Sequence, residues 1–143
     1  MHTENNYGFG SHLMLDCYGC PKDKLADVNF IFDLLNDFPK KINTTKIMAP
    51  SVFKYQGKAA EDWGVSGVVL IAESHISVHT FPDKQHAFID VFSCKGFDTD
   101  LAREELIKAF EATTHEVTIL DRGMHSMDAH LNQDFPQPAN AYV

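Results

Sequence analysis

The stretch from Gly64 to Asp83, GVSGVVLIAESHISVHTFPD, decides the fold of this chain. It begins with a continuous apolar run over 67–72, and after a polar break it alternates apolar and polar residues over 76–81. A continuous apolar run is typical of a strand buried on both faces, whereas alternation is typical of a strand with one buried face. We therefore predict two consecutive strands, followed by a turn and a third strand over 87–93.

The segments outside this stretch alternate strands with helices. Apolar residues recur at helical spacing from Asp23 to Pro39, and Asp98 offers an N-cap for a second helix. Further strands are predicted at 11–18, 45–53 and 116–120, with a polar connection at 54–63. This order predicts an α+β fold, with helices packed on one face of a largely antiparallel sheet and a β-α-β-β unit that occurs about twice.

Length and composition limit the classes of function. The 143 residues fit a single domain, 1–143, in which 131–143 is expected to be a loose tail. A formal net charge of −8, with basic residues scattered among acidic ones, argues against binding to nucleic acid. No apolar run approaches the roughly 20 residues of a membrane helix, so no membrane segment is expected. Three cysteines favour free thiols in a reducing compartment, and we expect a cytoplasmic protein.

A cluster of polar side chains follows the central apolar run. Ser74, His75, Ser77 and His79 all fall within this short segment. A serine hydrolase site is disfavoured, because no glycine-flanked nucleophile elbow surrounds Ser74. His75 and His79 could share a strand face and bind a metal together with Cys94, but this spacing is unspecific, and no metal is predicted.

Three motifs follow one another along the chain. They are Gly-Val-Ser-Gly-Val-Val at 64–69, Glu-Ser-His-Ile-Ser-Val-His-Thr-Phe-Pro at 73–82 and Asp-Val-Phe-Ser-Cys at 90–94. In this order they resemble the signature of the small prokaryotic pyruvoyl-dependent S-adenosylmethionine decarboxylases. Weaker similarity at 10–13, 16–20 and Arg122-Gly123 extends the resemblance over nearly the whole chain, apart from both ends.

The resemblance implies self-cleavage between Glu73 and Ser74. The products would be a beta chain, residues 1–73, and an alpha chain, residues 74–143. In this family the serine hydroxyl attacks the preceding carbonyl, and the serine becomes a covalent pyruvoyl group. That group is the cofactor, and it holds the substrate amine as a Schiff base while carbon dioxide leaves.

By the same resemblance, three other residues take part in the chemistry. Ser66 assists the first step of processing, and His79 is the base of the elimination that follows. Imidazole suits this role, because it titrates near neutral pH. Cys94 is the expected proton donor in decarboxylation.

The implied substrate is S-adenosylmethionine, whose decarboxylation supplies the aminopropyl donor for polyamine (spermidine) biosynthesis. Candidate substrate-binding residues are Phe81, Asp83 and Trp63. Relatives often have tryptophan in place of Phe81 and glutamate in place of Asp83. The ring could still contact adenine, and the shorter carboxylate could still bind a hydroxyl.

Alternatives to this function stay open. A decarboxylase of the same fold could act on ornithine or arginine, since a cationic amino acid would suit an acidic chain. A non-catalytic regulatory homologue is disfavoured by the intact Glu73-Ser74, His79 and Cys94, and a metal-binding module would require bound metal. The family pairs two processed protomers, and an uncovered sheet face gives an independent reason to expect a homodimer.

Overall fold

The computed structural model of the protein describes residues 9–124. Its strands are β1 (Gly10–Tyr18), β2 (Thr45–Lys46), β3 (Ser51–Gln56), β4 (Trp63–Ala72), β5 (Ser74–Phe81), β6 (His86–Ser93) and β7 (Thr114–Arg122). Its helices are α1 (Lys22–Leu25), α2 (Val28–Lys41) and α3 (Thr99–Phe110), with a 3₁₀ turn η1 (Pro82–Lys84) between β5 and β6.

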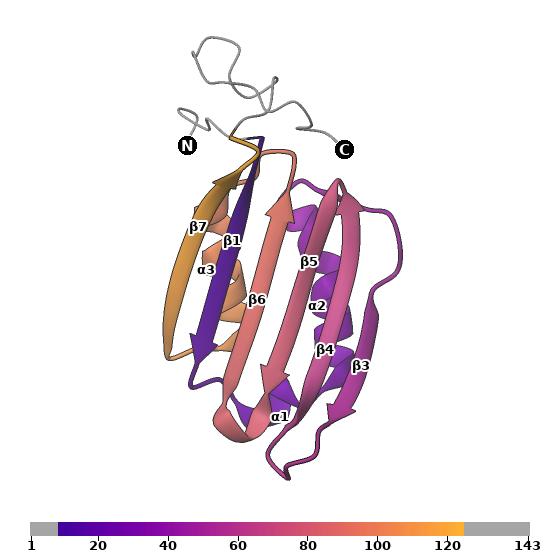
Figure 1. The fold of residues 1–143 in the computed structure, drawn as a ribbon, viewed down its shortest axis with the longest axis vertical. Coiled ribbons are helices and arrows are strands. Elements are labelled where there is room, and N and C mark those ends of the chain that lie inside the picture. The colour runs from indigo at the N-terminus through magenta and orange to yellow at the C-terminus, as the bar shows by residue number, and fades with distance from the viewer. Residues whose placement is uncertain (1–8, 125–143) are drawn as a thin grey trace.

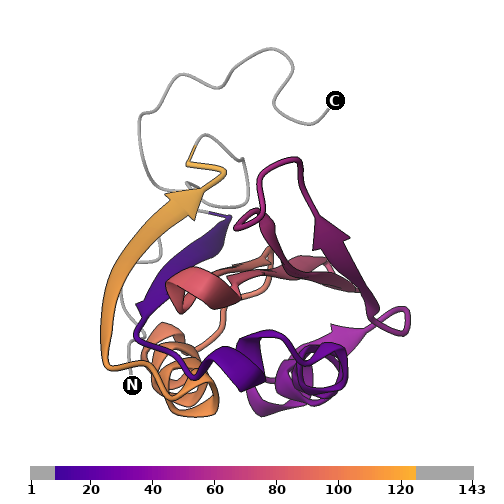
Figure 2. The same ribbon diagram turned by 90° about the horizontal axis from the view of Figure 1, so that it is seen from below.

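The strands form one seven-stranded sheet in the order β2-β4-β5-β6-β1-β7, with β3 also paired to β4. Every described pairing is antiparallel. The helices lie behind the sheet in Figure 1, and the view from below in Figure 2 shows them together on one side of it. The predicted α+β class, with helices on one face of an antiparallel sheet, is confirmed.

Strict alternation along the central strands gives the sheet a covered face and an open face. On β1, β5 and β6 every second side chain is buried, as Leu13, Val78 and Ile89 illustrate. The helices bury their own apolar stripes against this covered face, with Leu35 of α2 and Leu106 of α3 almost inaccessible. Burial of such side chains contributes about 1.5–3 kcal/mol each and drives formation of this core.

Two predicted elements are divided in the structure. The helix predicted from residue 23 breaks into α1 and α2, because the Asp27 side chain accepts hydrogen bonds from the N–H groups of Asn29 and Phe30 and caps a new start. The strand predicted at 45–53 is interrupted before Ser51. Its second part, β3, continues to Gln56 and thus takes the first residues of the predicted polar connection.

The predicted repeat can be followed only partly. β1, α2, β3 and β4 supply one β-α-β-β succession. β6, α3 and β7 supply the β-α-β part of a second, at the end of the described residues. The predicted loose tail at 131–143 lies outside the described residues.

Candidate active site

A tight hairpin at Glu73 joins β4 to β5, and Cys94, just after β6, lies against it. The register pairs Ser74 with Ser93, which brings the next residue, Cys94, to the hairpin. The Cys94 backbone N–H donates to the Glu73 carbonyl oxygen, with an N···O distance of 3.1 Å. The Ser74 Oγ lies 3.2 Å from the Cys94 Sγ, a contact in which either group can donate.

Ser74 has a backbone conformation that side chains disfavour. Its φ is 141°, far from the negative values that L-residues adopt. Such a conformation costs on the order of 1–3 kcal/mol and persists only where the surrounding structure imposes it. The strained residue directly follows the Glu73 carbonyl, whose oxygen already accepts a hydrogen bond. A donor in this position stabilises negative charge on that oxygen if the carbonyl carbon is attacked.

A second polar pair, Ser66 and His79, lies further along the same two strands. The β4–β5 hairpin places the two residues directly opposite each other. The Ser66 Oγ lies 2.9 Å from the His79 Nδ1, and both side chains are on the open face. Direction of proton donation in this pair depends on the His79 tautomer. A serine hydroxyl bonded to an exposed imidazole can exchange a proton with a ligand on this face.

The structure keeps these two pairs apart within one chain. His79 lies five residues beyond Ser74 on β5, about 16 Å away at the usual rise of a strand. His79 therefore does not contact Ser74 of its own chain. The sequence-predicted residues form two groups, Ser74 with Cys94 and Ser66 with His79.

A cavity of about 380 Å³ opens beside the Ser66–His79 pair. Its lining residues are Tyr55, Asp62, Trp63, Gly64, Ser66, His79, Thr80 and Phe81. The β4–β5 pairing ends at Ser66 and His79, and beyond it the Val65 N–H donates to the Thr80 hydroxyl at 2.9 Å. At Gly64, a Cβ would collide with the Thr80 carbonyl, so the close approach of the two strands here requires glycine.

Of the predicted substrate-binding residues, Trp63 and Phe81 line this cavity, whereas Asp83 is bonded to its own neighbours. The Trp63 Nε1–H donates to the Asp83 Oδ2 at 2.8 Å, and the Lys22 Nζ lies 2.7 Å from the Asp83 Oδ1. The hydrogen bonds from Lys22 and Trp63 lower the pKa of Asp83. Sequence reasoning missed Lys22, because a lysine at the start of a helix gives no distinguishing signal.

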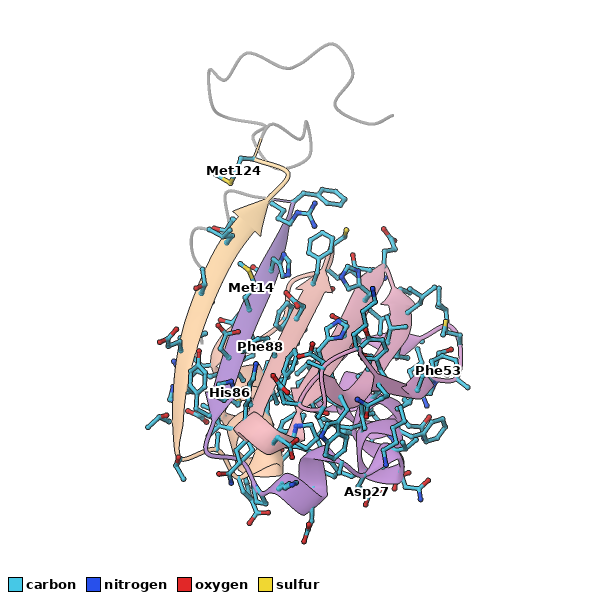
Figure 3. The ribbon with its side chains drawn as sticks, turned by 60° about the horizontal axis from the view of Figure 1, so that its bottom comes forward. Met14, Asp27, Phe53, His86, Phe88 and Met124 are labelled. Carbon is cyan, nitrogen blue, oxygen red and sulfur yellow. The ribbon has the colours of Figure 1, made fainter. Side chains whose placement is uncertain are left out.

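The rest of the open face carries aromatic and charged side chains. The rings of Phe81 and Phe88 lie 5.3 Å apart, and Figure 3 shows Phe88 near His86 and Met14, away from Phe53 at the β3 side. These rings provide apolar surface beside the cavity.

Acidic groups share the open face with these rings. His12 Nε2 lies 2.9 Å from the Asp90 Oδ1. The pKa of Asp16 is raised, first by burial and then by the charges of Glu116 and Asp90. The open face therefore differs from the apolar core on the other side of the sheet, because it carries charged side chains as well as aromatic rings.

The three cysteines are free thiols, and Cys17 and Cys20 are buried. The hydrogen bond that the Cys17 thiol donates to Cys20, together with burial, raises the pKa of Cys17 and keeps its thiol protonated. Among residues 9–124, no group of three or more His, Cys, Asp or Glu side chains could hold a metal ion. No helix in the described part of the chain is long and apolar enough to cross a membrane.

Comparison with known proteins identifies the family. The S-adenosylmethionine decarboxylase family matches residues 11–123. The chain is 33% identical to an S-adenosylmethionine decarboxylase proenzyme of Thermodesulfovibrio yellowstonii, over 91% of this chain and 90% of that protein. It is 35% identical to the proenzyme of the same name from Pyrococcus furiosus, over 84% of this chain and 83% of that protein.

A solved structure shares the fold. The adenosylmethionine decarboxylase of Aquifex aeolicus superposes with a TM-score of 0.66 at 34% identity, over 81% of this chain and 92% of that one. Fold and relatives together define a class, the decarboxylases built on one antiparallel sheet with helices on one face. The chain belongs to the S-adenosylmethionine decarboxylase family.

Proposed function

We propose that the chain is a proenzyme that cuts itself between Glu73 and Ser74 and then decarboxylates S-adenosylmethionine. The observation that supports this most directly is the geometry at the β4–β5 hairpin. A strained serine follows a carbonyl that already accepts a hydrogen bond from Cys94, and the Cys94 thiol contacts the serine hydroxyl. A serine in an ordinary turn has no need of this combination.

In the cleavage step, the Ser74 Oγ attacks the Glu73 carbonyl carbon. The C–N bond breaks, an ester replaces the amide, and the proton passes to the nitrogen of residue 74. The hydroxyl belongs to the residue next to its target, so the attack costs little entropy. The Cys94 backbone N–H, 3.1 Å from the Glu73 oxygen, stabilises the charge that develops there.

Removal of the Ser74 Cα proton then breaks the bond between Cβ and Oγ of residue 74. The main-chain carboxylate of Glu73 leaves as the new C-terminus, and residue 74 becomes a dehydroalanine. Water converts this group to pyruvoyl and releases ammonia. When present, the pyruvoyl group supplies an electron-withdrawing carbonyl for the release of carbon dioxide. The Cys94 Sγ, 3.2 Å from the Ser74 Oγ, is positioned to hold the proton that returns to the substrate carbon.

The base for the elimination comes, in this proposal, from a second copy of the chain. His79 is the expected base, yet within one chain it lies about 16 Å from Ser74 along β5. Two copies that pack open face against open face about a twofold axis can bring Ser66 and His79 of each to Ser74 and Cys94 of the other. The half-buried aromatic rings of the open face supply apolar contact area for such a homodimer.

The primary test is fragment analysis of purified protein. Two fragments, 1–73 and 74–143, are expected, with a pyruvoyl group blocking the N-terminus of the second in mass spectrometry. Ser74→Ala should remain at full length, and wild-type protein should release carbon dioxide from carboxyl-labelled S-adenosylmethionine. Intact wild-type protein with full activity would exclude the cofactor, and cleaved protein that acts only on ornithine or arginine would exclude the substrate.

Co-expression tests the exchange between copies. Ser74→Ala and His79→Ala should each stay uncleaved when expressed alone. In a mixed dimer, the His79→Ala chain keeps Ser74 and can receive His79 from the Ser74→Ala chain, so part of it should be cleaved. Lack of any cleavage in mixed dimers, verified with two different affinity tags, would show that His79 acts within its own chain or not at all.

A cytoplasmic role in polyamine synthesis completes the proposal. The decarboxylated product would be an aminopropyl donor, as for spermidine. The three free thiols support a reducing compartment. Fractionation of cells that produce the tagged protein, with enzyme activity as readout, tests this location.

A further inference from the structure

Three distant parts of the chain meet at Asp83. Lys22 opens α1, Trp63 opens β4, and Asp83 lies in the η1 turn. The turn is tied to the chain before α1 by a reciprocal pair of hydrogen bonds. The Cys20 N–H donates to the Gln85 carbonyl at 3.1 Å, and the Gln85 side-chain amide donates to the Cys20 carbonyl at 2.9 Å. These hydrogen bonds hold the turn that carries Asp83 in place.

Both oxygens of the Asp83 carboxylate are engaged by this arrangement. One accepts from the Trp63 indole N–H at 2.8 Å, and the other pairs with Lys22 at 2.7 Å. A carboxylate only accepts hydrogen bonds, and an indole N–H only donates, so the pair fixes the direction of the ring. Trp63 lines the cavity, and Asp83 is absent from the described lining residues.

Two ammonium groups further restrain the indole. The Lys22 Nζ lies 6.0 Å from the centroid of the Trp63 ring, and the Lys54 Nζ of β3 lies 5.5 Å from it. Both distances are within the range of a cation–π contact. Trp63 is thus held at its N–H by Asp83 and beside its ring by lysines from two elements.

We propose that Lys22 and Asp83 are positioning residues that hold Trp63 as a wall of the substrate cavity. This inference rests on the proposed function, which makes the cavity a substrate site. It assigns a role to Lys22 that the sequence motifs do not indicate.

Kinetics of Lys22→Met provide the first test, with Lys41→Met as the matched control. The Lys22–Asp83 pair has side-chain exposures of 57% and 34%, and the Lys41–Glu105 pair, remote from the cavity, has 58% and 34%. Loss of one restraint on Trp63 should raise KM for S-adenosylmethionine about three- to tenfold, as loss of one hydrogen bond does. Self-cleavage and kcat should stay close to wild type, and Lys22→Arg should restore KM.

Fluorescence gives a second readout that does not depend on turnover. Trp63 is the single tryptophan of the chain, so emission reports on this ring alone. In Lys22→Met and Asp83→Asn, acrylamide should quench the emission more strongly than in wild type or Lys41→Met. Addition of methylthioadenosine, a nucleoside thioether, should quench wild-type emission at lower concentration than it does in these two variants.

The outcomes separate the inference from the function on which it rests. Wild-type protein that neither decarboxylates S-adenosylmethionine nor responds to methylthioadenosine would overturn the proposed function. Active wild-type protein, with Lys22→Met equal to Lys41→Met in both KM and acrylamide quenching, would overturn the positioning role. A KM increase that Lys22→Arg does not reverse would also count against it, since arginine keeps the ion pair.

Discussion

The two faces of the sheet are made from alternate residues of the same strands, yet they differ in chemistry. On β6, Ile89 is buried under the helices at 1% exposure, while its neighbour Phe88 is half-buried on the open face. The buried side chains of the covered face are mostly aliphatic, whereas the open face holds histidines, carboxylates and aromatic rings. The difference teaches that one sheet can separate two tasks by residue parity: one face maintains the fold, and the other carries the Ser66–His79 pair and the aromatic rings.

Cys94→Ala should give the largest effect and leave stability nearly unchanged. The backbone N–H that reaches the Glu73 carbonyl remains in alanine, so self-cleavage should continue. Loss of a positioned proton donor should lower kcat about 10²- to 10⁴-fold. Fragment analysis together with turnover of S-adenosylmethionine checks both points. Normal turnover with normal product would make another group, such as His75, the proton donor.

Substitution on the covered face should show the opposite behaviour. Ile89→Ala leaves a cavity under the helices and should lower the free energy of unfolding by about 2–5 kcal/mol. Activity per folded molecule should remain, because Ile89 is on the face opposite to Ser66 and His79. Phe88→Ala, one residue away, should lower the free energy of unfolding less than Ile89→Ala does, and it should lower activity more. Equal effects of the two variants in urea unfolding and in turnover would contradict the division of roles between the two faces.

A smaller effect on stability is expected at Asp16, a carboxylate of the open face whose charge destabilises the folded state near neutral pH. Burial and the neighbouring carboxylates raise the pKa of Asp16, so the folded state binds this proton more tightly than the unfolded state. Stability from this group is therefore present below the ordinary carboxyl pKa and is lost as pH rises through the raised value. Asp16→Asn should increase Tm slightly near neutral pH, with a gain that disappears toward pH 4. A gain that does not depend on pH would exclude this cause.

Most of the fold could be predicted from the sequence, because the spacing of apolar residues and the positions of turn and capping residues indicate the same elements over long segments. The alternation at 76–81 and the cap at Asp98 gave the correct elements. The division of the first helix was missed, because the apolar spacing continues across Asp27 and hides its role as a cap. The extension of β3 was missed as well, because Phe53 and Tyr55 are exposed, so no burial pattern marks that strand.

The candidate residues could be named from motifs, but their grouping depends on strand register. A hairpin centred between Ala72 and Glu73 pairs residues whose numbers sum to a constant, and this pairs Ser66 with His79. That signal was available in the sequence once the turn was centred between Ala72 and Glu73. The approach of Cys94 to Ser74 depends on the β5–β6 register, which the η1 turn sets, and no motif gives it. Lys22 and Asp83 are even further apart in the sequence, and their contact depends on the packing of α1 against the η1 turn.

The strand order also determines what a cut at Ser74 does to the lifetime of the protein. The beta chain would hold β1 to β4 and the alpha chain β5 to β7, while β1 lies in the sheet between β6 and β7. The two pieces are interleaved, and separating them requires that three strand ladders open. The precursor folds as one chain, but once cut, its unfolded pieces can recombine only by meeting in solution. Persistence of the mature protein would thus depend on slow unfolding, and its recovery after denaturation would become dependent on concentration.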